Sequence, residues 1–395
     1  MADKAGGASG QGQKLHVAYG NALIAARGYG APETTEAFAR AGKSAFGDKD
    51  APERLAADYG RWAASYVRGE LSAMRAHAET FLGDVQARPD QPEAGVARRV
   101  AGVTHWFAGE YVEARETLEH ALALFQPGRD DDLAFRFGHD EGVAAMLYLA
   151  LTLWPLGHIG RAVPLVSDAE VRIAELAHVV TRALGRSYAA MFALMRRDMS
   201  RAAINGIELA QLTREHDLPF WRAFGVFFEG LASAQGSPAG RGLEAMRRGV
   251  ELLREQNVLI FDGFLKIALA EAEARAGDVD RAVSVLDEAL ATGDRTGHRT
   301  FDAELHRARG DMLLKRDPAN PAAAEEALQT AIAVAKKQGT RSFELRAALA
   351  LAKLYQSTGR DAEAHAVLAP ALEGFSATTA MPEIAEAQAL LVALA

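Results

Sequence analysis

Small residues recur along the chain at a fixed spacing. One column comprises Ala22, Gly102, Ala150, Ala190, Gly230, Ala270, Gly310 and Ala352, with Trp62 as the exception. A second column, twelve residues further on, comprises Thr34, Met74, Ala114, Ala162, Ala202, Gly242, Ala282, Ala324 and Ala364. A third, seven residues later, comprises Ala41, Phe81, Ala121, Ala169, Leu209, Gly249, Ala289, Ala331 and Ala371. Because closely crossing helices need small residues where they touch, the columns predict nine antiparallel helix pairs.

Glycines mark the predicted turn inside most pairs. They are Gly69, Gly109, Gly157, Gly236, Gly277 and Gly359. Glycine tolerates the positive φ that ends a helix, and the whole arrangement is typical of tetratricopeptide repeats. The clearest copies are 351–372 and 269–290. Most spacings here are 40 residues, whereas the standard unit has about 34, so we expect longer helices or connections and a deeper groove.

The pattern predicts an all-α fold, a right-handed superhelical solenoid of about nine tetratricopeptide-like pairs. We expect a disordered lead-in over 1–14, the solenoid over 15–381 and an amphipathic capping helix over 382–395, because the end of a solenoid must be covered. Two oversize intervals place insertions at 126–142 and 315–321. The first two pairs match the columns least well, as terminal repeats often do.

Composition narrows the function classes. The chain has 52 acidic and 44 basic residues, a net charge of -8, and no basic stripe, so we expect no nucleic-acid partner. It has no cysteine, which removes disulfides and thiolate sites and fits a cytoplasmic location. The N-terminus has no apolar signal segment, and the longest apolar stretch, 143–156, is interrupted by Pro155. That stretch is shorter than the ~20 residues a membrane helix needs, so we expect no membrane span.

Four strings carry a resemblance to a known family. They are "GNALIAARGYGAPETTEAFARA", "FRFGHDEGVAAMLYLALTLWPLGH", "LPFWRAFGVFFEGLASAQG" and "TFDAELHRARGDMLLKRDP". They resemble the C-terminal tetratricopeptide region of bacterial class III adenylate or guanylate cyclase and AAA-type or STAND-type ATPase signalling proteins, over roughly 15–395. The resemblance implies a sensor or scaffold part, with a cyclase or P-loop ATPase as a possible partner.

The catalytic parts of that family are missing from this sequence. There is no cyclase domain and no phosphate-binding loop G-x-x-x-x-G-K-[ST]. The segment 7–14, "GASGQGQK", has Gln13 where the motif requires lysine. The resemblance therefore implies a free-standing relative of the sensor part, or a fragment whose catalytic half lies elsewhere.

One inward-facing column of the first helices is aromatic. It holds Tyr66, Trp106 and Trp154 in three successive pairs. Aromatic side chains in a groove offer a large contact area to a peptide or flat ligand at little entropic cost. Packing between neighbouring pairs explains the same residues, and the sequence leaves both interpretations open.

Further along, the predicted wall of the groove is charged. Its members are Glu271, Arg275, Arg307, Asp311, Lys315, Arg346 and Lys353. The arginines and lysines suit a peptide carboxylate or another anionic ligand. Solvated helix faces have the same composition.

The insertion at 126–142 contains the densest cluster of possible metal ligands, which are Asp130, Asp131, Asp132, His139 and Asp140. Their spacing fits no calcium loop, and no H-E-x-x-H motif occurs. We therefore expect a flexible acidic loop on the surface, with no metal or cofactor. Phe220 and Trp221 are expected to seal the joint between pairs five and six.

No motif predicts an enzyme, since a nucleophile elbow and an arguable acid–base pair are both missing. The leading hypothesis is a non-catalytic interaction or regulatory scaffold that binds a peptide or partner domain in its groove. The alternative is a small-molecule sensor module that controls an attached or separate cyclase or ATPase. A third, a remnant of a signalling enzyme that serves only as a scaffold, also fits.

Overall fold

The structure is a computed structural model that describes residues 52–86, 88–234, 240–376 and 381–394, with a few isolated positions between 19 and 40. These residues form helices and no strand. The predicted lead-in and almost all of the first helix pair lie outside them. Among the described helices, none is long and apolar enough to cross a membrane.

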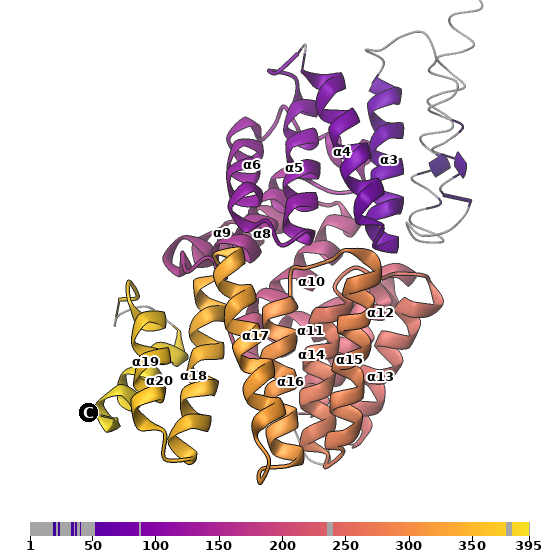
Figure 1. Cartoon of the computed structure of the whole chain (residues 1–395). Coiled ribbons are helices and arrows are strands. Elements are labelled where there is room, and N and C mark those ends of the chain that lie inside the picture. The colour runs from indigo at the N-terminus through magenta and orange to yellow at the C-terminus, as the bar shows by residue number, and fades with distance from the viewer. Residues whose placement is uncertain are drawn as a thin grey trace, which may run out of the picture. The chain divides into compact units, whose positions relative to one another are not determined.

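Eight antiparallel pairs follow one another in chain order (Figure 1). Pairs 2 to 5 are α3 (Pro52–Arg68) with α4 (Leu71–Val85), α5 (Pro92–Phe107) with α6 (Tyr111–Leu124), α8 (Glu141–Leu153) with α9 (Ile159–Glu175), and α10 (Val179–Met195) with α11 (Met199–Glu215). Pairs 6 to 9 are α12 (Pro219–Ala234) with α13 (Gly240–Glu255), α14 (Asp262–Arg275) with α15 (Val279–Thr296), α16 (Asp302–Arg316) with α17 (Ala322–Gln338), and α18 (Arg341–Ser357) with α19 (Asp361–Leu372).

The predicted columns of small residues lie at the helix crossings. A Cβ atom added to Gly230 would come within 2.7 Å of the Gly242 carbonyl oxygen on the partner helix. One added to Gly310 would come within 2.8 Å of Cγ of Leu328. The alanines of the columns, such as Ala190 and Ala282, are fully buried. The columns predicted from sequence therefore mark the contacts that hold each pair together.

The predicted turn glycines are confirmed wherever they are described. Gly69, Gly109, Gly157, Gly277 and Gly359 all have positive φ values. The sixth, Gly236, lies outside the described residues. Because other residues are strained in this region of φ, glycine lets the chain reverse within two or three residues.

Close contacts divide the chain into two compact units, which we treat separately. The first unit contains the chain up to His105, then Glu113–Leu149 and Leu165–Ile260. The second contains Trp106–Val112, Ala150–Pro164 and Phe261 onward. The second unit therefore joins pairs 7 to 9 with the turns of pairs 3 and 4.

Within the second unit, these turns are capped by residues far along the chain. The backbone N–H of Arg299 donates to the Phe107 carbonyl at 2.8 Å, and the N–H of Ser342 donates to the Pro155 carbonyl at 2.9 Å. The Ser342 hydroxyl also donates to the Trp154 carbonyl at 2.7 Å. The last carbonyls of a helix have no partner inside that helix, so these bonds satisfy groups that would otherwise be unpaired.

The insertion at 126–142 is not the flexible surface loop that the sequence predicted. It contains a short helix, α7 (Leu133–Phe137), whose Leu133 and Phe137 are buried. The Phe137 ring lies 5.2 Å from the ring of Tyr59 on α3. The prediction was wrong because it weighed the acidic residues and overlooked this apolar side of the segment.

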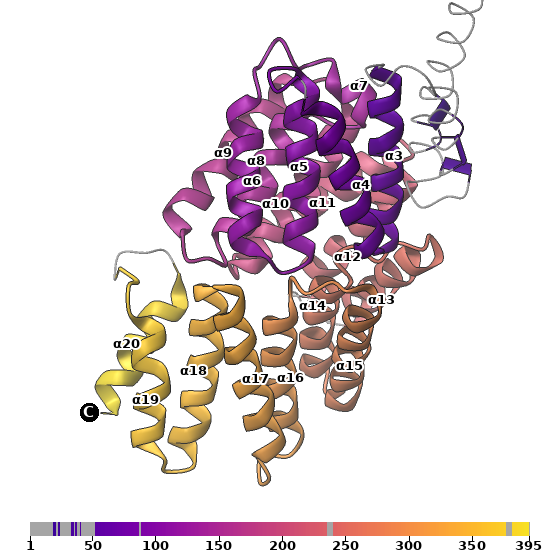
Figure 2. The same ribbon diagram turned by 45° about the horizontal axis from the view of Figure 1, so that its top comes forward.

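The C-terminal helix α20 (Pro382–Ala393) packs on α18 and α19, beyond the last pair. Figure 2 shows α16 to α20 following one another side by side. Ile384 and Ala387 face the pair and are buried. The predicted fold class, an all-helical solenoid of tetratricopeptide-like pairs with a capping helix, is confirmed in the described residues.

Candidate binding pocket

A pocket in the first unit is built on one face of α3. Tyr59, Trp62, Ala63 and Tyr66 line it, and their spacing of three and four residues places them on the same side of the helix. The Trp62 and Tyr66 rings are stacked, with centroids 5.0 Å apart. The Trp62 Nε1–H donates to Thr104 Oγ1 at 2.9 Å, which fixes the indole.

The other walls come from later first helices. Arg99 on α5, Tyr148 on α8, Leu184 and Tyr188 on α10, and Phe220 and Trp221 on α12 complete the lining, with His139 from the segment before α8. The pocket is partly open and has an empty volume of about 400 Å³, open solvent included. Five consecutive pairs therefore contribute their first helices to this pocket.

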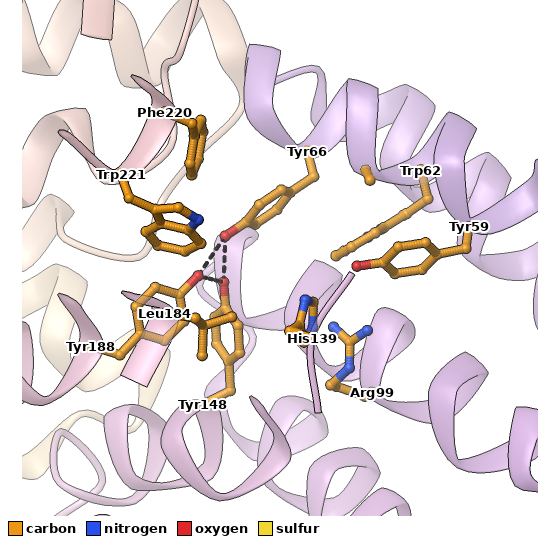
Figure 3. Close-up of a pocket in the computed structure, with 11 residues that line it drawn as sticks. Tyr59, Trp62, Tyr66, Arg99, His139, Tyr148, Leu184, Tyr188, Phe220 and Trp221 are labelled. Carbon is orange, nitrogen blue, oxygen red and sulfur yellow. Dashed lines mark hydrogen bonds between the residues drawn. The ribbon is translucent and has the colours of Figure 1, made fainter. Parts of the chain in front are cut away.

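Three tyrosine hydroxyls meet inside the pocket (Figure 3). The Tyr66 oxygen lies 2.6 Å from that of Tyr148 and 2.8 Å from that of Tyr188, and the last two are 3.0 Å apart. Burial, together with the neighbouring hydroxyls, raises the pKa of Tyr66 and Tyr148 well above the usual value. The hydroxyls are therefore protonated at neutral pH and offer oxygen lone pairs to a ligand.

His139 is the unpartnered polar group of the site. Its side chain is only 6% exposed, and neither ring nitrogen has a hydrogen-bond partner. Burial, and then the neighbouring Arg99 and His178 side chains, lower the pKa of His139 well below its usual value. A neutral imidazole has one N–H donor and one nitrogen acceptor, and neither is paired here.

Arg99 and Glu141 form a buried ion pair beside His139. The Arg99 Nε and Nη2 atoms donate to the two Glu141 oxygens at 2.5 and 3.0 Å. The guanidinium also lies 5.6 Å from the centroid of the Tyr59 ring. Burial alone would lower the pKa of Arg99, but the Glu141 carboxylate overrides it and raises the pKa. The pair is therefore ionised and has no net charge.

These groups leave the pocket aromatic and uncharged overall. The ion pair cancels, His139 is neutral and the tyrosines are protonated. Figure 3 places His139 and Arg99 towards Trp62 and Tyr59, and the three hydroxyls towards Trp221. A flat ligand would find ring faces on several sides and polar groups at two places.

Of the predicted aromatic column, only Tyr66 lines this pocket. Trp106 and Trp154 belong to the second unit and are 0% and 1% exposed. The Trp106 ring lies 5.8 Å from Phe261 and 5.5 Å from Phe301, and the Trp154 ring lies 6.0 Å from Phe343. The structure thus places both tryptophans in packing contacts.

The predicted charged wall contains two buried arginines of the second unit. Arg307 donates to Glu304 at 2.9 Å and to Asp311 at 2.7 Å, and its Nη2 atom is 3.7 Å from a Glu271 oxygen. Arg346 donates to Glu383 at 2.7 Å and lies 3.4 Å from Glu304. Both guanidinium groups are therefore neutralised by carboxylates of the chain itself.

The remaining members of this set are exposed. Lys353 pairs with Glu386 of α20 at 2.6 Å, and both side chains are about half exposed. Arg275 and Lys315 are exposed on α14 and α16. The structure therefore joins Glu271, Arg307, Asp311 and Arg346 in one network through Glu304. Arg275, Lys315 and Lys353 lie outside it.

The acidic insertion is held by arginines. Arg172 donates to Asp131 at 2.7 Å and to Asp140 at 2.5 and 3.0 Å, and Arg129 donates to Asp130 at 2.5 and 2.8 Å. Asp132 stands at the N-cap of α7. Among the described residues, no group of three or more histidine, aspartate or glutamate side chains is placed to hold a metal ion.

Sequence reasoning missed several residues of the pocket. Tyr148 and Tyr188 are 40 residues apart and stand two residues before Ala150 and Ala190 of the first column. That shared register was a signal that they lie on the same wall. His139 carried no such signal, because its position depends on how the insertion folds back towards α3. Phe220 and Trp221, predicted to seal a joint, are buried and also line the pocket.

The comparisons with known proteins identify no family for the chain. No family model matches it. One curated relative, an uncharacterized protein of Rhizobium meliloti (strain 1021), is 26% identical over 253 residues, or 64% of this chain. The chain spans about a quarter of that relative's length, since the match covers 24% of it.

Several solved structures have similar helical arrangements. The human IFIT1 dimer with PPP-AAAA has a TM-score of 0.46 at 14% identity, covering 82% of this chain and 72% of that one. The apo form of RapI has a TM-score of 0.46 at 9% identity, with coverages of 96% and 98%. Yeast Tom70 has a TM-score of 0.43 at 13% identity, with coverages of 88% and 64%. At these scores the matches transfer no function to this chain.

Proposed function

We propose that this chain is a non-catalytic interaction and regulatory module, and that the aromatic pocket of the first unit is its recognition site. In this proposal a segment of a partner protein lies along the wall formed by the first helices and inserts one flat side-chain group into the pocket. The observation that carries the proposal is the buried His139, which lines the pocket and whose two ring nitrogens have no hydrogen-bond partner.

The same residues argue against catalysis at this site. A catalytic histidine needs a nucleophile within hydrogen-bond reach and a group that orients its ring, and His139 has neither. The tyrosine hydroxyls have raised pKa values, which makes them poor nucleophiles. Binding is the chemistry that remains for these groups.

A second candidate function is a small-molecule sensor. The limited volume of the pocket and its lining of rings on several sides favour it, because such sites enclose most of a small ligand's surface. The sequence resemblance further suggests that a cyclase or a P-loop ATPase reads the bound state. In both cases the pocket is the recognition site.

The interaction hypothesis is tested with a displayed library of random peptides selected on the purified chain. Ala63→Leu narrows the pocket, and Ala76→Leu makes the same change at an exposed position of α4. We expect selected peptides to bind the parent and the Ala76→Leu variant equally, and the Ala63→Leu variant at least about tenfold more weakly. Thermal unfolding would verify that both variants are folded.

Two outcomes would contradict the interaction hypothesis. One is a selection that yields no binding peptide. The other is a set of peptides that bind the parent and the folded Ala63→Leu variant with the same affinity, because recognition would then lie outside the pocket.

A further inference from the structure

The shape, the polar groups and the charges of the pocket indicate the chemical class of its ligand. We infer that it takes an uncharged, planar aromatic group that carries a neutral hydrogen-bonding substituent for His139, such as an aryl carboxamide or a nucleobase. This inference rests on the proposed function, because it concerns the same site.

The shape of the site favours a planar aromatic group. Trp62 and Tyr66 are stacked on one side of the pocket, and the Tyr188 and Trp221 rings lie 6.5 Å apart with their planes at 61° on another. Aromatic rings prefer such stacked and edge-to-face neighbours, which contribute beyond the burial of area. A planar ring can use both kinds of contact at once, whereas a branched aliphatic group would lose the stacking.

The polar groups favour a ligand with a hydrogen-bonding substituent. The neutral His139 imidazole presents one of each, and both are desolvated without a partner. A buried polar group without a partner costs free energy that a complementary ligand would recover. The two ring nitrogens point in divergent directions, so one ligand group pairs with one of them at a time. An amide or a nucleobase can serve as the donor or as the acceptor there, while a purely apolar ring pairs with neither nitrogen.

The charges disfavour an ionic ligand. An anion would need a free cation, but both oxygens of Glu141 already bind Arg99. A cation would suit the aromatic faces, yet the Arg99 guanidinium already lies over the Tyr59 and Trp62 rings at 5.6 and 6.0 Å. A second positive charge there would be repelled, so an uncharged ligand fits best.

A series of probes of similar size tests this chemistry. Calorimetry or saturation-transfer NMR on the full chain would compare benzamide, acetophenone, benzoate and phenyltrimethylammonium, with adenine as a larger neutral ring. We expect benzamide and adenine to bind about tenfold or more tightly than the two charged probes. Acetophenone, which has an acceptor but no donor, should lie between them.

Variants separate the role of His139 from general effects. His139→Phe should weaken benzamide about tenfold and acetophenone by a smaller factor, while His139→Gln, which keeps a donor and an acceptor, should recover part of the affinity. His298→Phe is the matched control, since His298 also has an unpartnered ring nitrogen but lies in the second unit. It should leave the binding of benzamide unchanged.

Several results would overturn the inference. One is tighter binding of benzoate or phenyltrimethylammonium than of benzamide. Another is binding of benzamide by the folded His139→Phe variant with the same affinity as by the parent. The third is no measurable binding of benzamide and adenine. The peptide selection is scored independently. If the selected peptides bind in the pocket but none of the neutral probes binds, this ligand class is refuted and the proposed interaction function is retained.

Discussion

Tyr66, Trp106 and Trp154 stand at one register position of three successive helix pairs, yet their surroundings differ. Each follows its column position, Trp62, Gly102 or Ala150, by four residues. Tyr66 lines a partly open pocket with His139, whereas Trp106 and Trp154 are sealed by phenylalanines of pairs 7 to 9. The same wall position lines a pocket in one unit and is buried in the core of the other.

The polar groups of the two regions differ in the same way. In the second unit, buried Arg307 and Arg346 are both satisfied by carboxylates of the chain. In the pocket, Arg99 is satisfied but His139 is not. Buried polar groups are nearly always hydrogen-bonded, but His298 of the second unit also has an unpartnered ring nitrogen, so this feature alone does not mark a ligand site. The difference lies in the surroundings: the buried arginines of the second unit pair with carboxylates, whereas His139 has no partner and also lines a partly open pocket.

The largest effect is expected from breaking the ion pairs of the second unit. Arg346→Met leaves Glu383 and Glu304 buried with one cation fewer, which should lower the free energy of unfolding by about 3–5 kcal/mol. Urea denaturation measures it. Lys353→Met, which breaks an exposed pair with Glu386, should cost less than about 1 kcal/mol. Equal losses from the two variants would contradict the account of a stabilising buried network.

The helix crossings should respond alike in both units. An added Cβ at Gly102 would lie 2.7 Å from Cγ of Leu118, and one at Gly310 would lie 2.8 Å from Cγ of Leu328. Gly102→Ala and Gly310→Ala should each destabilise by about 1–3 kcal/mol, because the crossing is overpacked. Gly83→Ala, where nothing lies within 4 Å, should be neutral or stabilising in the same denaturation assay. A neutral effect at both crossings would show that the columns do not set the packing.

Acid should destabilise the second unit through His298. Burial lowers the pKa of His298 to about 4 from 6.5, so the unfolded chain binds a proton there more readily than the folded chain. Stability from the neutral ring is complete above pH 6.5 and is lost as the pH falls towards 4, by roughly 2 kcal/mol at pH 5. Thermal melts between pH 5 and 7.5 compare the melting temperatures of the parent and the His298→Asn variant. The difference between the two melting temperatures should shrink at low pH. A constant difference would refute the shift.

The smallest effect is expected from a pocket hydroxyl. Tyr188→Phe leaves Tyr66 and Tyr148 bonded to each other, so it should cost less than about 1 kcal/mol. Tyr111→Phe in the second unit removes the 2.6 Å bond to the buried Thr300 carbonyl and should cost about 1–3 kcal/mol. Thermal denaturation compares them. A larger loss for Tyr188→Phe would mean that the hydroxyl cluster is structural.

Much of the fold followed from short-range chemistry. Small residues at crossings and glycines at turns act within one helix pair, so their spacing was enough to predict the repeat. The burial of Ala190 and the positive φ of Gly277 match those predictions. Helix α7 was missed because five residues with four apolar side chains give too little periodicity to outweigh the neighbouring aspartates.

The candidate site depended on contacts that the sequence does not encode locally. Tyr66 was identified from its column, but the pocket also needs Trp221, which lies 155 residues later, and His139 from an insertion. For Trp106, the decisive partners were Phe261 and Phe301. Those phenylalanines stand nine residues before Ala270 and Gly310 of the first column, in register with Trp221 and Phe343. Which of these aromatics meet depends on how distant pairs approach each other.

The four tryptophans of the chain allow a direct test of the central contrast. Trp62 and Trp221 line the pocket, while Trp106 and Trp154 are sealed in the second unit. Fluorine NMR of 5-fluorotryptophan-labelled protein, assigned with single Trp→Phe variants, would follow all four during a benzamide titration. The account predicts shifts at Trp62 and Trp221 and none at Trp106 and Trp154. Shifts of the Trp106 or Trp154 resonance, with no shift at Trp62 and Trp221, would contradict the assignment of the pocket as the binding site.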